Sequence, residues 1–124
     1  MGLQFDKALG LHADALRLRA DRTKVLASNL ANASTPGYQA RDVDFGAALA
    51  RARGDDPMLA LDTLLGSASP DLQYRLPQHP AQDGNTVELG VEQAAFAQNV
   101  SDFQISLRFV DMKLKGLAKA IAGQ

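Results

Sequence analysis

The carboxylates and histidines of this chain are the side chains that could carry acid–base chemistry or hold a metal ion. Asp42 and Asp44 alternate along the chain, and His12 and His79 lie far apart in the sequence. Isolated acidic groups of this kind are usually solvated or cap helices, because acid–base catalysis needs them to converge in a cleft. The chain has no cysteine, no glycine-rich phosphate loop and no histidine pair at metal-ligand spacing. We therefore expect a protein that is not an enzyme and that binds no metal and no cofactor.

Length and charge limit the remaining classes of function. The 124 residues allow one modest domain, and the net charge of −1 is unevenly distributed. Residues 1–53 hold eight basic and five acidic groups, residues 54–104 hold one basic and eight acidic groups, and residues 105–124 hold four basic and one acidic. A dense basic cluster with interleaved aromatic residues is lacking, so we expect no binding to nucleic acid. The start of the chain does not resemble a Sec signal peptide, and we expect no direct membrane insertion.

The segment Ser-Asn-Leu-Ala-Asn-Ala-Ser-Thr-Pro-Gly-Tyr, residues 28–38, is the most informative motif. It predicts a helix end, because Asn tolerates the left-handed conformation that often closes a helix and the residue before a proline is pushed out of the helical region. Pro-Gly then fits the centre of a type II turn, in which Gly supplies the positive φ. The candidate residues of this turn motif are Asn29, Asn32, Thr35, Pro36, Gly37 and Tyr38.

Two long helices are predicted at the two ends of the chain. Residues from about 3 to 32 carry two neighbouring apolar rows at helical spacing, which widens the apolar stripe beyond a single seam. Residues from about 89 to 121 carry a heptad pattern sustained over more than four heptads. That second seam consists of Leu89, Gln93, Phe96, Val100, Phe103, Leu107, Val110, Leu114, Leu117 and Ile121.

The middle of the chain has weaker signals. We expect a helix over 41–53, capped by Asp42 or Asp44, and a short helix near 58–65. Residues 72–76 form a candidate short strand, and Asp-Gly-Asn-Thr at 83–86 indicates a turn. Frequent proline and glycine make the rest of the segment from about 54 to 85 irregular.

These elements predict a mainly α fold, in which two long terminal helices pack as an antiparallel coiled-coil-like hairpin around an irregular middle that holds short helices or a short strand. Residues 1–38 and 86–124 form the expected terminal-helix assembly domain, and 39–85 the outward-facing segment. A hairpin of two helices cannot cover every apolar row, so the remaining apolar surface needs a partner. The candidate packing or assembly residues are Leu26, Leu30, Phe103, Leu107, Val110, Leu114 and Leu117. Each could instead belong to the core of the single chain.

The turn motif of residues 28–38, with its continuation Gln-Ala-Arg-Asp-Val-Asp-Phe at 39–45, resembles the N-terminal signature of bacterial flagellar axial proteins. Residues 85–121, with the Lys-Gly-Leu sequence near the end, resemble the C-terminal helix of the same family. Together with the predicted first helix, the matches cover about two-thirds of the chain, and they point to the subunits of the proximal rod.

The resemblance implies a structural subunit of the flagellar basal-body rod, the drive shaft that crosses the periplasm. Its implied partners are other rod subunits, the hook–basal-body adapter protein, the MS ring and the flagellar export gate. It also implies export through the flagellar type III apparatus, without a cleaved signal peptide. The alternative function is a self-contained helical hairpin that serves as an adapter or chaperone-like binding module of a secretion system.

Overall fold

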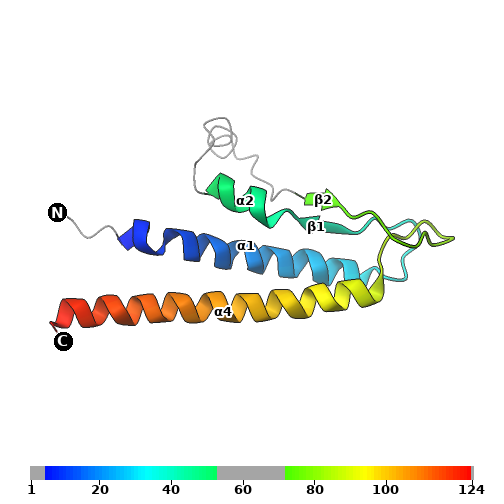
Figure 1. Cartoon of the computed structure of the whole chain (residues 1–124). Helices are drawn as coiled ribbons and strands as arrows, with labels where there is room; N and C mark the ends of the chain where they lie inside the picture. Colours follow the sequence, from blue (N-terminus) through cyan, green and yellow to red (C-terminus); the bar gives the residue numbers. More distant parts are fainter. Residues whose placement is uncertain (1–4, 53–71, 124) are drawn as a thin grey trace.

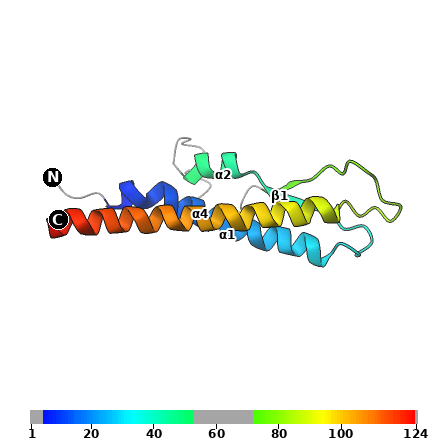
Figure 2. The same cartoon turned by 60° about the horizontal axis from the view of Figure 1, so that its bottom comes forward.

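The computed structural model describes residues 5–52 and 72–123. Its two long helices, α1 (Phe5–Ala31) and α4 (Leu89–Ala122), lie side by side and run in opposite directions, so that the start of α1 and the end of α4 lie at the same end of the hairpin (Figure 1). Turned by 60°, the molecule shows α1 crossing behind α4 at a shallow angle (Figure 2). The predicted fold class, mainly α with a terminal-helix hairpin, is confirmed.

Between the long helices the chain forms a small sheet and a short helix. Strand β1 (Arg41–Val43) pairs antiparallel with β2 (Leu72–Tyr74), with Asp42 opposite Gln73. Helix α2 (Phe45–Ala52) follows β1, and both α2 and β1 contact α1. Figure 1 shows this layer on the side of α1 away from α4. Helix α1 is therefore the central element of the structure, flanked by α4 and by the sheet layer.

The helix expected over 41–53 is wrong in its first residues. Residues 41–43 form a strand instead, because they pair antiparallel with residues 72–74 of β2. The helix begins at Phe45, after Asp44, whose Oδ1 accepts a hydrogen bond from the Ala47 N–H at 3.1 Å. Of the two expected caps, Asp44 caps the helix. The helix expected near 58–65 lies outside the described residues.

The described residues contain a very small apolar core. The buried hydrophobic residues are Leu26 on α1, Ala40 and Val43 on the strand side, and Ala48 on α2. Helix α4 contributes two buried residues, Glu92 and Asn99, and both are polar. The contact between the two long helices is thus centred on polar side chains, while much apolar surface lies outside it.

Candidate functional site

The turn that ends α1 has the geometry expected of Pro-Gly at its centre. Gly37 has φ +72°, and the Tyr38 N–H donates to the Thr35 carbonyl at 3.3 Å. A side chain is disfavoured at such a φ, which explains the glycine. Asn32, one residue past α1, caps the helix by donating from its side chain to the Ser28 carbonyl at 2.8 Å.

Asn29 connects this turn to strand β1. Its Nδ2 donates to the Arg41 carbonyl at 2.6 Å, and its Oδ1 accepts from the Arg41 N–H at 3.1 Å. Oδ1 also accepts from the Tyr38 hydroxyl at 3.3 Å. The side-chain amide thus occupies the place of a neighbouring strand and satisfies both backbone groups of Arg41. Because Asn29 is completely buried, its amide holds the start of β1 against α1.

Asn85 holds the end of α1 from the other side. Its buried side-chain Nδ2 lies within 3.0 Å of the carbonyl oxygens of Asn32 and Ala33 and within 2.8 Å of that of Thr35. The last carbonyls of a helix have no partner within the helix, so an amide donor from elsewhere in the chain stabilises the helix end. Asn85 thereby fixes the start of α4 to the end of α1.

The residues around Asn85 continue this connection through the backbone. The Thr86 N–H donates to the Tyr38 carbonyl at 3.0 Å, and the Ala40 N–H donates to the Thr86 Oγ1 at 2.7 Å. The Gly37 N–H donates to the Asp83 carbonyl at 2.9 Å. Residues 83–86, predicted as a turn, thus bind the extended segment 37–40 that follows the turn of α1.

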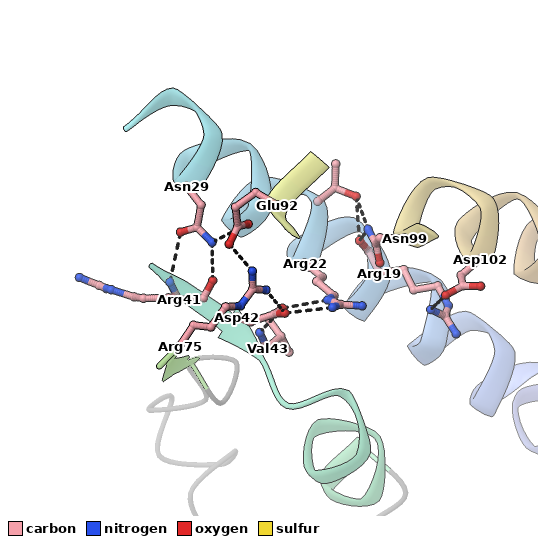
Figure 3. A network of polar contacts seen from close by, with 11 residues as sticks. Arg19, Arg22, Asn29, Arg41, Asp42, Val43, Arg75, Glu92, Asn99 and Asp102 are labelled. Carbon is pink, nitrogen blue, oxygen red and sulfur yellow. Dashed lines mark hydrogen bonds and ion pairs between the residues drawn. The ribbon is translucent and has the colours of Figure 1, made fainter. Parts of the chain in front are cut away.

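A cluster of four charged residues lies beside Asn29 and links three elements (Figure 3). Asp42 of β1 accepts two hydrogen bonds from Arg22 of α1, at 2.8 and 2.9 Å, and one from Arg75, at 2.6 Å. Arg75 also pairs with Glu92 of α4. Glu92 is completely buried and accepts a further hydrogen bond from Asn29 at 3.1 Å. Two cations and two carboxylates therefore neutralise one another where α1, the sheet and α4 meet.

The contacts within this charge cluster shift the pKa values of Asp42 and Arg22. Burial alone would raise the pKa of Asp42, but the hydrogen bonds and charge of Arg22, with help from the Val43 N–H and Arg75, lower it below its ordinary value. The hydrogen bond to Asp42 raises the pKa of Arg22, against the opposing effect of burial. Both groups are therefore held in their charged forms.

A second polar contact follows along the hairpin. Asn99 of α4 is completely buried, and its Nδ2 donates to the Arg19 carbonyl at 3.0 Å and to the Thr23 hydroxyl at 2.8 Å. Arg19 pairs with Asp102 of α4 at 3.2 Å, and its guanidinium lies 4.4 Å from the centre of the Phe45 ring. Arg19 thus contacts both α4 and α2.

The residues predicted to pack lie at different depths. Leu26 is fully buried, and Leu30, Phe103, Val110 and Leu117 are partly buried. Leu107 and Leu114 remain 50% and 47% exposed. Only part of the predicted apolar seam of α4 is therefore buried, because Glu92 and Asn99 form the centre of the contact between α4 and α1. The role of these leucines in assembly stays a prediction.

Sequence reasoning missed the residues that join the two long helices most directly. Asn85, Glu92 and Asn99 are spaced by seven residues, so they repeat on one face of the chain leading into and along α4. This polar heptad row was the signal that could have found them. The predicted apolar seam is shifted from this polar row by one residue along the sequence. The Arg22–Asp42–Arg75 cluster has no comparable local signal, because its members come from distant segments.

The site is suited to holding elements together. Among residues 5–52 and 72–123, no three His, Asp or Glu side chains gather as a metal site. A search of the same residues for a helix long and apolar enough to cross a membrane finds none. The carboxylates of the charge cluster form ion pairs with its arginines, so their charges stabilise the fold.

Comparisons with known proteins agree with these features. A family model described as "Flagella basal body rod protein" matches residues 9–39, which include most of α1 and the turn that follows it. The flagellar basal body rod protein FlgB of Cereibacter sphaeroides is 45% identical over 125 residues, covering 97% of this chain and 98% of that protein.

Two further relatives come from other organisms. FlgB of Aeromonas hydrophila is 43% identical over 131 residues, covering 100% of this chain and 99% of that protein. FlgB of Escherichia coli is 39% identical over 131 residues and covers 95% of each chain. Membership of this family favours the rod subunit over the adapter or chaperone-like module that the sequence also allowed, and the family is one of structural proteins and not of enzymes. The chain belongs to the FlgB family of flagellar basal body rod proteins, and it is a structural subunit of the rod.

Proposed function

We propose that this chain is a proximal-rod subunit that assembles through α1 and α4. Its neighbours would be other rod subunits and the hook–basal-body adapter protein, at the base of the periplasmic drive shaft close to the MS ring and the export gate. We further propose that it reaches this place through the flagellar export apparatus without cleavage of a signal peptide. Membership of the rod-protein family supports these finer assignments.

The observation that carries the proposal is the distribution of polar and apolar side chains on α4. The face against α1 is centred on Glu92 and Asn99, both 0% exposed. Large apolar residues of α4 remain exposed beside that contact, contrary to the usual arrangement of a helical hairpin in water, although one of them, Phe109, also stacks on His12 of α1 with the ring centres 6.1 Å apart. Those exposed on α4 are Leu89, Val91, Val100, Ile105, Leu107, Phe109, Met112, Leu114 and Ile121.

Exposed apolar residues in continuous rows indicate a surface that is covered in the working state. Val100, Leu107, Leu114 and Ile121 repeat every seven residues along one side of α4. Ile105, Phe109 and Met112 lie on the other side of the same helix. Two different apolar sides favour two different neighbours, and contacts between unlike surfaces generate open helical assemblies.

The middle segment, 39–85, is proposed to face outward from the assembly formed by residues 1–38 and 86–124. In support, the sheet is tied to the hairpin through Asp42 and Arg75, and α2 contacts α1. This arrangement leaves the outer side of α4 free of the sheet layer in both views (Figures 1 and 2). The middle segment can therefore stay attached while α4 packs against neighbours.

The test introduces a charge on α4 at a position from which assembly would exclude water. In the single chain, Asp at position 107 would stay half in water because Leu107 is 50% exposed, so Leu107→Asp should leave folding unchanged. In an assembled rod the same charge would be buried without a partner, which is strongly unfavourable. Gln104→Asp is the matched control, because Gln104 is an exposed polar residue one turn away.

We expect isolated basal bodies to contain the Gln104→Asp variant and to lack Leu107→Asp. Circular dichroism of the purified proteins checks that both variants fold alike. Normal incorporation of Leu107→Asp into basal bodies would contradict assembly through this side of α4.

A further inference from the structure

Strand β2 has an outer edge that no other strand of the described residues covers. Within residues 5–52 and 72–123 the sheet consists of β1 and β2, and Figure 1 shows β2 beyond β1 as seen from α1. An uncovered edge presents backbone N–H and C=O groups that can pair with another chain. Proteins that leave such an edge free usually protect it with charged side chains, a proline or a bulge. The outer edge of β2 is therefore a candidate binding surface if it lacks this protection.

The hydrogen bonds of β1 show which backbone groups of β2 point outward. In an antiparallel pair, two residues directly opposite each other either exchange both backbone hydrogen bonds or exchange none. Arg41 lies opposite Tyr74, and its N–H and C=O are both bound to the Asn29 side chain. The next residue, Arg75, donates inward from its N–H to the Ala40 carbonyl at 2.9 Å. The N–H and C=O of Tyr74 therefore point to the free edge.

Leu72 shares this orientation, because it lies two residues before Tyr74 in the same strand. Opposite Leu72, the Val43 N–H donates to the Asp42 Oδ1 at 2.8 Å and not to β2. Among the described residues, no other group takes the outward hydrogen bonds of Leu72 and Tyr74. The edge thus offers the N–H and C=O of both residues in the spacing that a third strand requires.

The side chains along this edge are apolar and exposed. Leu72, Tyr74 and Leu76 alternate along β2 and its continuation, so they stand on one face, with exposed fractions of 39%, 64% and 89%. Gln73 and Arg75 stand on the other face, and the charge of Arg75 is already paired within the charge cluster. The exposed face of β2 therefore has neither a charged side chain nor a proline to protect its edge.

Arg41 indicates the chemistry of the partner. Its guanidinium lies over the Tyr74 ring, 5.4 Å from the ring centre, on the same face as the exposed apolar residues. Arg41 is exposed and forms no ion pair with the described residues. A carboxylate placed beside the Tyr74 ring would meet this cation, whereas an ammonium group there would be repelled.

We propose that the free edge of β2 binds an extended segment of another protein as a third strand, with an acidic residue opposite Tyr74 and apolar residues opposite Leu72 and Leu76. Because side chains on one face of a strand alternate, the segment has the sequence pattern apolar-x-acidic-x-apolar. The described segments outside the helices, residues 32–44 and 72–88, do not contain this pattern, so we assign the partner to a different protein and not to a second copy. Pairing of this kind obtains affinity from the backbone and specificity from alternate side chains.

This surface is separate from the apolar sides of α4. It belongs to the middle segment, 39–85, which is proposed to face outward from the assembly. The inference therefore goes beyond the proposed assembly through the terminal helices and does not depend on it.

Two synthetic peptides test the proposed partner on the isolated full chain. The Glu peptide, Thr-Val-Thr-Glu-Thr-Val-Thr, has the required pattern, and the Lys peptide replaces its Glu by Lys. At saturating Glu peptide, amide hydrogen exchange followed by NMR should slow roughly tenfold at Leu72 and Tyr74, because their outward N–H groups gain partners. Exchange at Gln73, between them, should not change. The Lys peptide should bind about tenfold more weakly, because Arg41 repels it.

Variants separate the contributions of the backbone and the charge. Tyr74→Pro removes the outward N–H but no hydrogen bond to β1, and proline is tolerated at a strand edge that faces solvent. It should abolish binding of the Glu peptide, whereas Tyr74→Val, which keeps the N–H and also lacks the ring, should retain binding. Circular dichroism checks that both variants fold alike.

Arg41→Gln should weaken binding of the Glu peptide about tenfold and remove the preference over the Lys peptide. The matched control is Arg17→Gln, because Arg17 is an exposed arginine of α1 outside this surface. It removes the same charge and should leave the binding of both peptides unchanged.

Three results would overturn the inference. One is unchanged exchange at Leu72 and Tyr74 with millimolar Glu peptide, and another is equal binding of that peptide to Tyr74→Pro and Tyr74→Val. The third is equal binding of the Glu and Lys peptides to the natural chain. Self-association of the chain through the same two amides would identify a second copy as the partner and would also contradict the proposal. None of these results bears on incorporation of Leu107→Asp into basal bodies, so this inference and the proposed function fail separately.

Discussion

The side-chain amide of Asn29 donates to the carboxylate of Glu92 at 3.1 Å, a hydrogen bond between residues 63 positions apart in the chain. Both residues are completely buried. Through Asn29 the bond reaches the backbone of β1, and through Glu92 it reaches Arg75 after β2. This pair thus joins the two long helices, and both of its residues also hold the sheet, so separation of the sheet from the hairpin would break the contacts of Asn29 with Arg41 and of Glu92 with Arg75.

Loss of the Asn29 amide should therefore destabilise the whole fold. Asn29→Ala leaves the Arg41 backbone N–H and carbonyl without their partners, and buried polar groups left unpaired cost about 1–3 kcal/mol each. We expect the free energy of unfolding in urea to fall by about 2–4 kcal/mol. Asn32→Ala is the control and should cost less than about 1 kcal/mol, because both hydrogen bonds of the Asn32 side chain, to the Ser28 carbonyl and from the Thr35 hydroxyl, are exposed at the helix end. Equal losses for the two variants would contradict a central role for Asn29.

The charge cluster should make stability depend on pH through Asp42. Because the folded pKa of Asp42 lies below its ordinary value of 3.8, ionised Asp42 stabilises the fold above that value. The contribution is lost as the pH falls through the lowered folded pKa. Comparison of the natural chain with Asp42→Asn isolates this effect from the other carboxylates.

We expect the difference in the free energy of unfolding between the two proteins to be constant between about pH 5 and about pH 7. It should shrink as the pH falls below 3.8, where Asp42 begins to be protonated in the unfolded chain. Thermal unfolding followed by circular dichroism at each pH measures it. A difference that stays constant down to about pH 2 would show that Asp42 has the same pKa in the folded and unfolded chain, which would contradict stabilisation by its ionised form.

The sequence allowed the helices and turns to be predicted because local chemistry determines them. Apolar residues at heptad spacing predicted both long helices. Asp44 was one of the two caps predicted for α2, and Pro36-Gly37 predicted the turn after α1. Each of these signals lies within a few residues of the feature that it predicts. The strand at 41–43 was missed because its pairing depends on residues 72–74, about thirty positions away.

The polar centre of the hairpin could not be predicted from apolar periodicity. An apolar row indicates that a residue needs a partner, but not whether the partner lies in the same chain. In a single globular domain the row would face inward, and Glu92 and Asn99 would face water. In this chain they face α1, and Leu107 and Leu114 remain half exposed. The reversal is understandable for a subunit whose apolar contacts are completed by neighbours.

Asn85 should be sensitive even to an isosteric change. Asn85→Asp replaces an amide donor by a carboxylate beside three carbonyl oxygens, which repel it and cannot donate to it. We expect Asn85→Asp to lower the free energy of unfolding more than Asn85→Ala, which itself should cost about 1–3 kcal/mol. If the alanine variant were the less stable of the two at neutral pH, the amide donor would not be the important group.

Gly37 should be required for its conformation and not for lack of space. A Cβ at position 37 would meet no described atom within 4 Å, but φ is +72°. A β-branched side chain disfavours this conformation, so Gly37→Val should cost about 1–3 kcal/mol and abolish swimming while expression stays normal. Gly37→Asn should keep swimming, because Asn tolerates positive φ. Motile cells carrying Gly37→Val would show that the turn at position 37 is not required for swimming.

The central claim is that much of the apolar surface of α4 is buried by other subunits and not within the chain. Amide hydrogen exchange over residues 95–121, measured on dilute purified protein and on isolated basal bodies, tests it most directly. We predict rapid exchange in the dilute protein and strong protection in the basal body. Strong protection of the same amides in the dilute protein, unchanged on assembly, would contradict the account.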